Sequence, residues 1–281
     1  MLGEKGGKHE TPVINSQRLP VTLFAAKPTL EIEAMLADAL LAVSGEFRGM
    51  YAPVHVALPD TVIRGKVFEL DELPKTAGMR DALLRWRFSK EWQRPEEALN
   101  CCGFDLGQDR GKRLYFGQAA DRQWLDCVRR ALARAGLTPW SLNAATTYRF
   151  NCFHDVMAGA GGALLSLEPD CWSLLLWDGS RRVRHVLTRL RENRAAENEA
   201  VSITDEVERA VLAYVKENGS RDIGRLYLAG SNAEMSAFAG VLDVRLGERA
   251  VPLHADEKIS VTSAGMRDGL APLALAAALS T

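Results

Sequence analysis

Residues 163–179 read ALLSLEPDCWSLLLWDG and combine two apolar runs with a short acidic loop. The runs Ala163–Leu167 and Ser173–Trp177 have strand length, and Asp178-Gly179 after them is a turn signal. A strand, a tight loop and a second strand suit a hairpin whose loop wraps around a small ligand. The first chemical question is therefore whether this loop holds a phosphate group.

Cys152 and His154 offer a second possible chemistry, that of a nucleophile beside a base. Residues i and i+2 share a face on a strand but not on a helix. The segment Ala144–Val156 is predicted to be helical, so an unrelated hydrolase is the weaker hypothesis. The chain has five cysteines, an odd number, and no C-x-x-C motif. This pattern indicates neither a disulfide framework nor a zinc site, and it fits a reducing compartment.

The composition is that of a soluble globular protein, with 281 residues, a net charge of −1 and 47% hydrophobic residues. A near-neutral charge gives no general attraction to nucleic acid or to anionic lipid. No run approaches the roughly 20 apolar residues of a membrane-spanning helix. Residues 1–18 are expected to be a disordered or vector-derived start, because the first ten lack the apolar core of a secretion signal.

Strands and helices are predicted to alternate in both halves of the chain, which indicates an α/β architecture. The Gly-rich stretch Ala158–Gly162 is the expected boundary between the halves. Ser202 with Asp205 resembles a capping box at the start of a helix. The expected strands are Leu19–Ala25, Val54–Leu58, Val62–Leu70, Ala98–Leu106, Lys112–Gln118, the two runs of the hairpin, Arg182–Leu190, Arg225–Ala229 and Ala250–Leu253.

Six segments in this order resemble the PilM family of actin-like pilus assembly proteins. The family serves type IV and mannose-sensitive haemagglutinin pilus biogenesis, and the cell-division protein FtsA is a more distant relative. The segments are HVALPDTVIRGKVFELDELP (55–74), RFSKEW (87–92), WLDCVRRALARAGLTPWSLN (124–143), the hairpin 163–179, RLYLAGSNAEMSAFAGVLDVRLG (225–247) and GLAPLALAAAL (269–279).

The resemblance implies a two-lobed actin-like, ribonuclease-H-like α/β fold with an inserted small α+β subdomain. The chain shows no Asp-x-Gly before residue 28, so the first phosphate hairpin of that fold is expected to be missing. The implied divisions are an incomplete first-lobe core (19–60), the inserted subdomain (61–138), a return to the first lobe (139–160) and the second lobe (161–281).

The family would also imply ATP and Mg²⁺ between the lobes, but the second hairpin departs from the family pattern. Ser166 stands where the family has its magnesium-binding Asp, and Glu168 stands in place of a glycine. Pro169 removes a backbone donor. A carboxylate 4 Å from a phosphate costs about 4 kcal/mol, and a lost charge-assisted donor about 1.5–3 kcal/mol more.

The sequence therefore predicts a degenerate nucleotide pocket, made of Ser166, Glu168, Asp170, Gly230 and Ser231, with no cofactor, no metal and no catalytic residue. Gly230 and Ser231 are what remains of the turn that lies against adenosine in the family. An alternative has Asp170 take over the metal from a shifted loop.

The favoured hypothesis is a non-catalytic cytoplasmic scaffold, peripheral to the inner membrane through its partner. By the resemblance, it would bind the N-terminal cytoplasmic peptide of a PilN-like bitopic protein in a groove between the core and the inserted subdomain. The expected partner-binding residues are Val62, Val67, Met79, Leu83, Trp86 and Trp124. The alternative is an active actin-like ATPase of pilus assembly or type II secretion, although a secretion homologue is expected to continue into a membrane helix.

Overall fold

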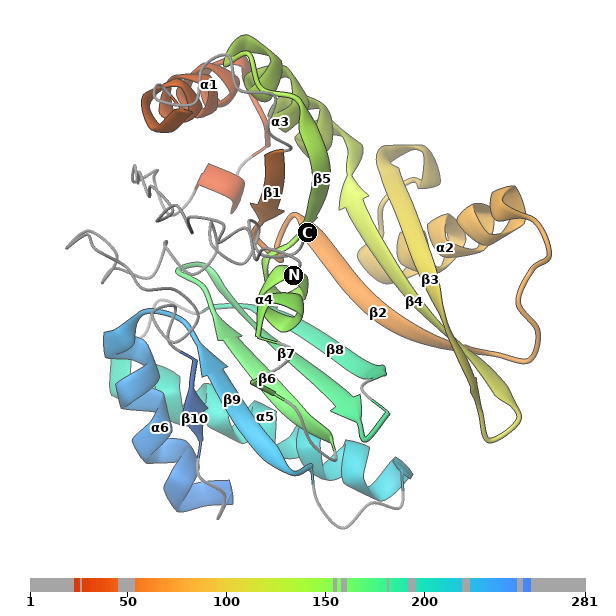
Figure 1. The fold of residues 1–281 in the computed structure, drawn as a ribbon, viewed down its shortest axis with the longest axis vertical. Helices are drawn as coiled ribbons and strands as arrows, with labels where there is room; N and C mark the ends of the chain where they lie inside the picture. Colours follow the sequence, from red (N-terminus) through yellow and green to blue (C-terminus); the bar gives the residue numbers. More distant parts are fainter. Residues whose placement is uncertain are drawn as a thin grey trace, which may run out of the picture.

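The computed structural model describes residues 23–25, 27–44, 54–153, 156–157, 161–180, 182–191, 196–218, 223–246 and 250–253. They form two lobes and a smaller unit that projects from the first lobe, at the right of Figure 1. The expected start at 1–18 and the expected closing helix lie outside the described residues.

The second lobe is built on a five-stranded sheet with the order β10-β9-β6-β7-β8. Strands β6, β7 and β8 pair antiparallel, whereas β9 pairs parallel with β6, and β10 parallel with β9. This strand order is that of a ribonuclease-H-like lobe. The bounds are β6 Gly161–Leu167, β7 Cys171–Asp178, β8 Val183–Leu190, α5 Ala196–Asn218, β9 Arg225–Ala229, α6 Asn232–Leu246 and β10 Val251–Pro252.

Both faces of this sheet are covered, which explains why its central strands are mostly apolar. Leu165 and Leu174 pack against α5 and α6, whereas Leu164 and Leu175 point to the opposite face. Helix α4 (Ala145–Cys152) covers that face with Tyr148 and its neighbours. Side chains alternate between the faces of a strand, so β6 and β7 need apolar residues on both faces when both faces are buried.

The first lobe contains the parallel pair β1 (Val54–Leu58) and β5 (Pro139–Ala144). Helices α1 (Leu30–Ser44) and α3 (Arg122–Arg134) pack on each other beside this pair, and a short 3-10 turn covers Leu23–Ala25. Thr29 caps α1, since its hydroxyl accepts from the amide of Ile32 at 3.3 Å.

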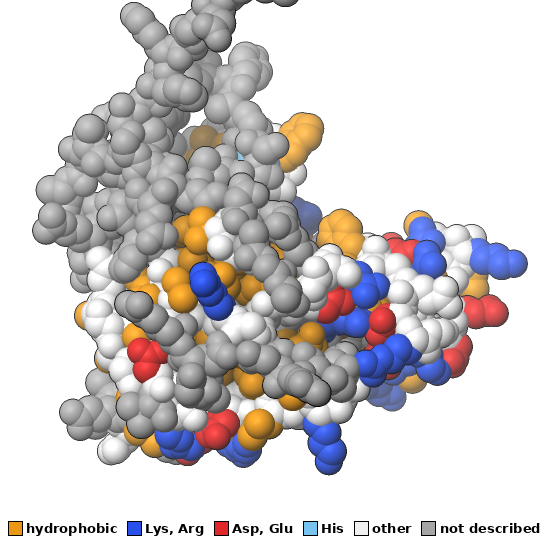
Figure 2. Space-filling view, turned by 60° about the horizontal axis from the view of Figure 1, so that its bottom comes forward, with side chains coloured by type: hydrophobic (Ala, Val, Ile, Leu, Met, Phe, Trp, Pro, Cys, Tyr) orange, Lys and Arg blue, Asp and Glu red, His pale blue; other side chains and the backbone are white. Residues whose placement is uncertain are grey.

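The inserted unit is an antiparallel sheet with the order β2-β4-β3 and one helix, α2 (Ala77–Trp92). The strands are β2 (Ile63–Leu70), β3 (Leu99–Asp109) and β4 (Lys112–Asp121), and a 3-10 turn at Glu96–Ala98 precedes β3. Figure 2 shows Lys and Arg interspersed with Asp and Glu over its right-hand part, where this unit lies. The visible surface there has a mixed charge.

Helix α2 packs closely on one face of this sheet, where glycines leave room for it. A Cβ on Gly117 would lie 2.6 Å from Leu84 of the helix. The helix begins at Thr76, whose hydroxyl accepts from the amide of Met79 at 3.3 Å. The opposite face of the sheet is turned towards the two lobes, and β2 runs beside β8.

Three sequence expectations need correction. Leu23–Ala25 is a 3-10 turn and not part of a strand, and residues 19–22 lie outside the described part. Helix α5 already begins at Ala196, so Ser202 lies inside it and is not a cap. Helix α3, which was assigned to the inserted unit through residue 138, packs on α1 in the first-lobe core. None of the described helices is long and apolar enough to cross a membrane.

Candidate functional site

The β6–β7 loop, which the sequence identifies as a possible phosphate loop, is held by an ion pair inside the protein. Arg149 on α4 reaches under the loop, and its Nη1 donates to both the hydroxyl of Ser166 and the carboxylate of Glu168. Arg149 is 1% exposed and Glu168 4% exposed. The ion pair therefore fills the interior behind the loop with protein groups.

The loop also uses its own backbone groups internally. The amide of Glu168 donates to the carbonyl of Cys171 at 2.9 Å, which closes the hairpin. Pro169 has no amide proton. Arg191 donates to the carbonyl of Glu168 at 2.9 Å and pairs with Glu199 and Glu234. The amide of Glu168 thus forms the hydrogen bond that closes the hairpin, and it is not free to bind an anion.

A second buried carboxyl lies near Arg149. Asp60 follows β1, is 2% exposed, and accepts from the amide of Thr146 at 3.1 Å at the start of α4. Burial raises the pKa of Asp60, and hydrogen bonds from Ser173 and Thr146 oppose the shift. Burial raises the pKa of Glu168 to about 7, although the charge of Arg149 opposes it. Within this cluster, the carboxyl of Glu168 therefore titrates near neutral pH.

The other three residues of the predicted nucleotide pocket also have partners in the protein. Asp170 accepts from the hydroxyl of Thr61 at 3.4 Å. Ser231 forms a reciprocal cap with Glu234 at the start of α6, with an Oγ to Oε2 distance of 2.7 Å. A Cβ on Gly230 would lie 3.0 Å from the Cβ of Leu167, so this glycine allows close packing of the turn on the hairpin.

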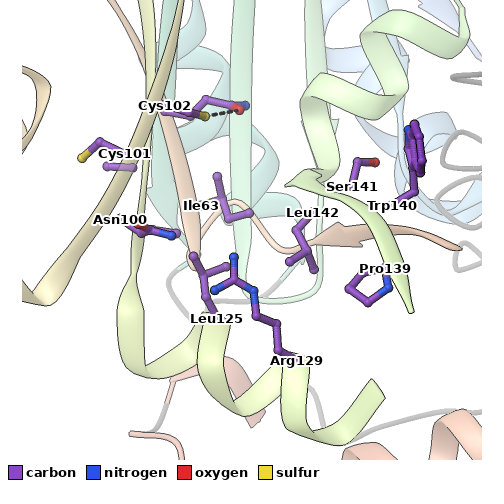
Figure 3. Close-up of a pocket in the computed structure, with 13 residues that line it drawn as sticks. Ile63, Asn100, Cys101, Cys102, Leu125, Arg129, Pro139, Trp140, Ser141 and Leu142 are labelled. Carbon is purple, nitrogen blue, oxygen red and sulfur yellow. Dashed lines mark hydrogen bonds between the residues drawn. The ribbon is translucent and has the colours of Figure 1, made fainter. Parts of the chain in front are cut away.

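A groove of about 320 Å³ opens between the inserted unit and the first lobe (Figure 3). Its walls come from β3 and β4 on one side and from β5 and α3 on the other, with Ile63 of β2 at the base. The lining residues are Ile63, Asn100, Cys101, Cys102, Gln118, Ala119, Ala120, Leu125, Arg129, Pro139, Trp140, Ser141 and Leu142.

The groove combines an apolar floor with a few polar groups. Ile63, Leu125 and Leu142 point into it, and the guanidinium of Arg129 reaches between them (Figure 3). Trp140 is 77% exposed and stands at the rim. Apolar floors with sparse polar groups are typical of sites that hold a peptide or a small molecule.

The edge of β5 is part of this wall. Pro139, Trp140, Ser141 and Leu142 are consecutive and all line the groove, although alternate residues of a strand point to opposite faces. The backbone edge itself must therefore face the groove. Among the described strands β5 pairs with β1 alone, so this edge is available to an added strand.

The six residues predicted to bind a partner do not line this groove. Val62 is 2% exposed and Trp124 is 5% exposed, and both belong to the first-lobe core. The other four lie in the inserted unit: half-buried Val67 on β2, and Met79, Leu83 and Trp86 on α2. Helix α2 covers the sheet face that contains Gly117, and Val67 lies on the opposite face.

Cys152 ends helix α4 and is buried, whereas His154 lies outside the described residues. The helical prediction for this segment is thus confirmed as far as Cys152. A nucleophile needs access to its substrate, so the geometry gives the hydrolase hypothesis no support.

The two lobes, the ribonuclease-H-like strand order and the inserted unit define the fold as actin-like. The predicted fold class is therefore confirmed. More particularly, the chain is PilM-like in structure: it is similar to a chain of the "PilM-PilN type IV pilus biogenesis complex", with a TM-score of 0.75 and 16% identity. The match covers 95% of this chain and 89% of that one.

A second solved structure is the cytoplasmic domain of EpsL, an inner membrane component of the type II secretion system of Vibrio cholerae. It matches with a TM-score of 0.44 and 14% identity, over 68% of this chain and 66% of that one. No family model matches the sequence, and no curated protein matches it either.

Proposed function

We propose that this chain is a non-catalytic scaffold of a type IV-like pilus biogenesis machine. It binds the N-terminal cytoplasmic peptide of a PilN-like bitopic inner-membrane protein in the groove between the inserted unit and the first lobe. The chain is then cytoplasmic and peripheral to the inner membrane through this partner. The observation that carries the proposal is the groove with an edge of β5 that no described strand pairs with, in a fold shared with a chain of a PilM–PilN complex.

The dimensions and chemistry of the groove suit an extended peptide. A volume of about 320 Å³ accommodates a few side chains, and Leu125 with Leu142 offers them apolar contacts. The edge of β5 supplies main-chain donors and acceptors for strand addition. The hydroxyl of Ser141 is hydrogen-bonded to His55 and Tyr148. It therefore stiffens the wall of the groove and does not offer a free hydroxyl to the peptide.

The scaffold does not need a nucleotide in this proposal, because the phosphate loop is engaged with Arg149. A magnesium nucleotide would have to displace the buried pair of Arg149 and Glu168. Breaking a buried pair costs about 3–5 kcal/mol, which weakens binding by roughly two to four powers of ten.

The groove can be tested as the peptide site by introducing a large side chain into it at an exposed position. Asn100 is exposed and lines the groove, so Asn100→Trp should block peptide binding at little cost to folding. We expect at least a tenfold loss of affinity for a synthetic N-terminal peptide of the partner, measured by isothermal titration. The matched control is Ala82→Trp, which places the same ring on the exposed side of α2.

Wild-type affinity in Asn100→Trp, with Ala82→Trp also unaffected, would rule out the groove as the peptide site. The active ATPase is the competing function, and it predicts a binding heat on titration with Mg-ATP. The scaffold predicts none.

A further inference from the structure

The β3–β4 hairpin joins two distant parts of the protein. Near its root, Asn100, Cys102 and Gln118 line the groove. At its tip, the hairpin lies beside the turn between β7 and β8 of the second lobe (Figure 1). The hairpin therefore extends from the groove to the second lobe, and none of the lining residues given above belongs to that lobe.

The tip is held by charges on the second lobe. Asp109 pairs with Arg184 at 2.7 Å, and Arg182 donates to the carbonyl of Gln108 at 3.1 Å. Asp178 lies on the other side of both arginines, at 2.9 Å from Arg184 and 3.0 Å from Arg182. Two carboxylates and two guanidiniums thus form a network, and Arg184 is only 10% exposed on its side chain.

The turn at the tip makes a further contact. Arg110 donates to the carbonyl of Glu217 near the end of α5 at 2.9 Å. Arg110 and Gly111 have φ values of +47° and +81°, as in the tight two-residue turns that keep a hairpin compact. The guanidinium of Arg184 holds the pKa of Asp109 below its usual range, so this carboxylate is charged at neutral pH.

The root is anchored separately to the first-lobe side. Gln118 is 3% exposed and donates to the hydroxyl of Thr147 on α4 at 2.9 Å. Between root and tip, β3 and β4 are paired from Leu99 to Asp109, with a bulge between Asp105 and Gly107. Because pairing continues on both sides of this bulge, we expect a displacement of the tip to reach the wall that the hairpin gives to the groove.

We propose that Asp109 and Arg184 are positioning residues of the peptide groove: their pairing fixes the inserted unit against the second lobe and keeps the groove ready for its ligand. This inference rests on the proposed function for the identity of the ligand. Its mechanical part, the coupling between the tip and the groove, stands on the contacts alone. Preorganisation of this kind raises affinity by reducing the ordering that binding requires.

The test compares two variants of the full chain that remove one carboxylate charge each. Asp109→Asn removes the ion pair with Arg184 of the second lobe, whereas Asp105→Asn breaks a local pair with Arg113 within the same hairpin. For Asp109→Asn we expect roughly threefold to tenfold weaker binding of the partner peptide and faster amide exchange at residues 140–142. For Asp105→Asn we expect wild-type values of both.

The two readouts keep this inference separate from the proposed function. If the wild-type protein does not bind the peptide, the proposed function fails, and amide exchange at residues 140–142 still decides the coupling. Unchanged exchange in Asp109→Asn would overturn the inference. So would peptide binding by Asp109→Asn that is as tight as in the wild type, or tighter.

Discussion

Arg149→Met is the sharpest perturbation of the buried cluster behind the phosphate loop. Methionine has similar length and removes the charge without leaving a large void. The change leaves Glu168 without its cation and Ser166 without its donor, and both are buried. Asp60 loses the same favourable charge.

The size of the effect follows from burial. Removing one partner of a buried ion pair costs about 3–5 kcal/mol, and an unsatisfied buried hydroxyl about 1 kcal/mol more. For a chain of this size each kcal/mol lowers the melting temperature by about 2–4 °C, so we expect a fall of about 10 °C or more at pH 8. The loss should be smaller at pH 6, because Glu168 takes up a proton and no longer needs a cation.

Thermal unfolding monitored by circular dichroism at pH 6 and pH 8 measures both effects. The double variant Arg149→Met with Glu168→Leu is the control, since replacing both members of a buried pair restores much of the stability. A single variant that melts like the wild type at pH 8 would refute the reasoning. So would a double variant that melts no higher than the single one.

Three further predictions concern the loop and the groove. Burial raises the pKa of Glu168, so the folded state binds the proton of this carboxyl more tightly than the unfolded state does. The contribution of Glu168 to the free energy of unfolding therefore falls as the pH rises from about 4.5 to about 7. Glu168→Gln should therefore gain stability relative to the wild type between pH 5 and pH 7.5 in denaturant titrations, and a constant difference would contradict this. Gly230→Ala should cost about 1–3 kcal/mol in the same assay, because its Cβ would crowd Leu167; a neutral result would mean that the turn is not tightly packed. Arg129→Gln should weaken peptide binding by roughly threefold to tenfold and reduce its salt dependence, and an unchanged titration would remove Arg129 from the peptide site.

The sequence predicts the fold well where local patterns agree with tertiary packing. The hairpin at 163–179 and the strand Val54–Leu58 were both found, because apolar runs bounded by turn residues determine them locally. The start of α5 was missed, because Ser202 and Asp205 imitate a cap within a longer helix. Short polar patterns cannot show whether a helix continues upstream of them.

The candidate site was predicted only in part. The sequence singled out Glu168 as unsuitable for a phosphate, but not Arg149, whose pairing with it depends on α4 lying beneath the sheet. A single arginine within the aromatic run Tyr148-Arg149-Phe150 was the available signal. The groove residues were missed because the prediction chose α2, Val67 and two side chains, Val62 and Trp124, that pack in the core.

The most direct test of the central claim is the affinity for the partner's N-terminal peptide, measured with and without saturating Mg-ATP. The account predicts the same affinity in both titrations and no heat from Mg-ATP alone, since the loop at Glu168 is engaged with Arg149. An affinity that changes with the nucleotide, or micromolar binding of Mg-ATP itself, would contradict it.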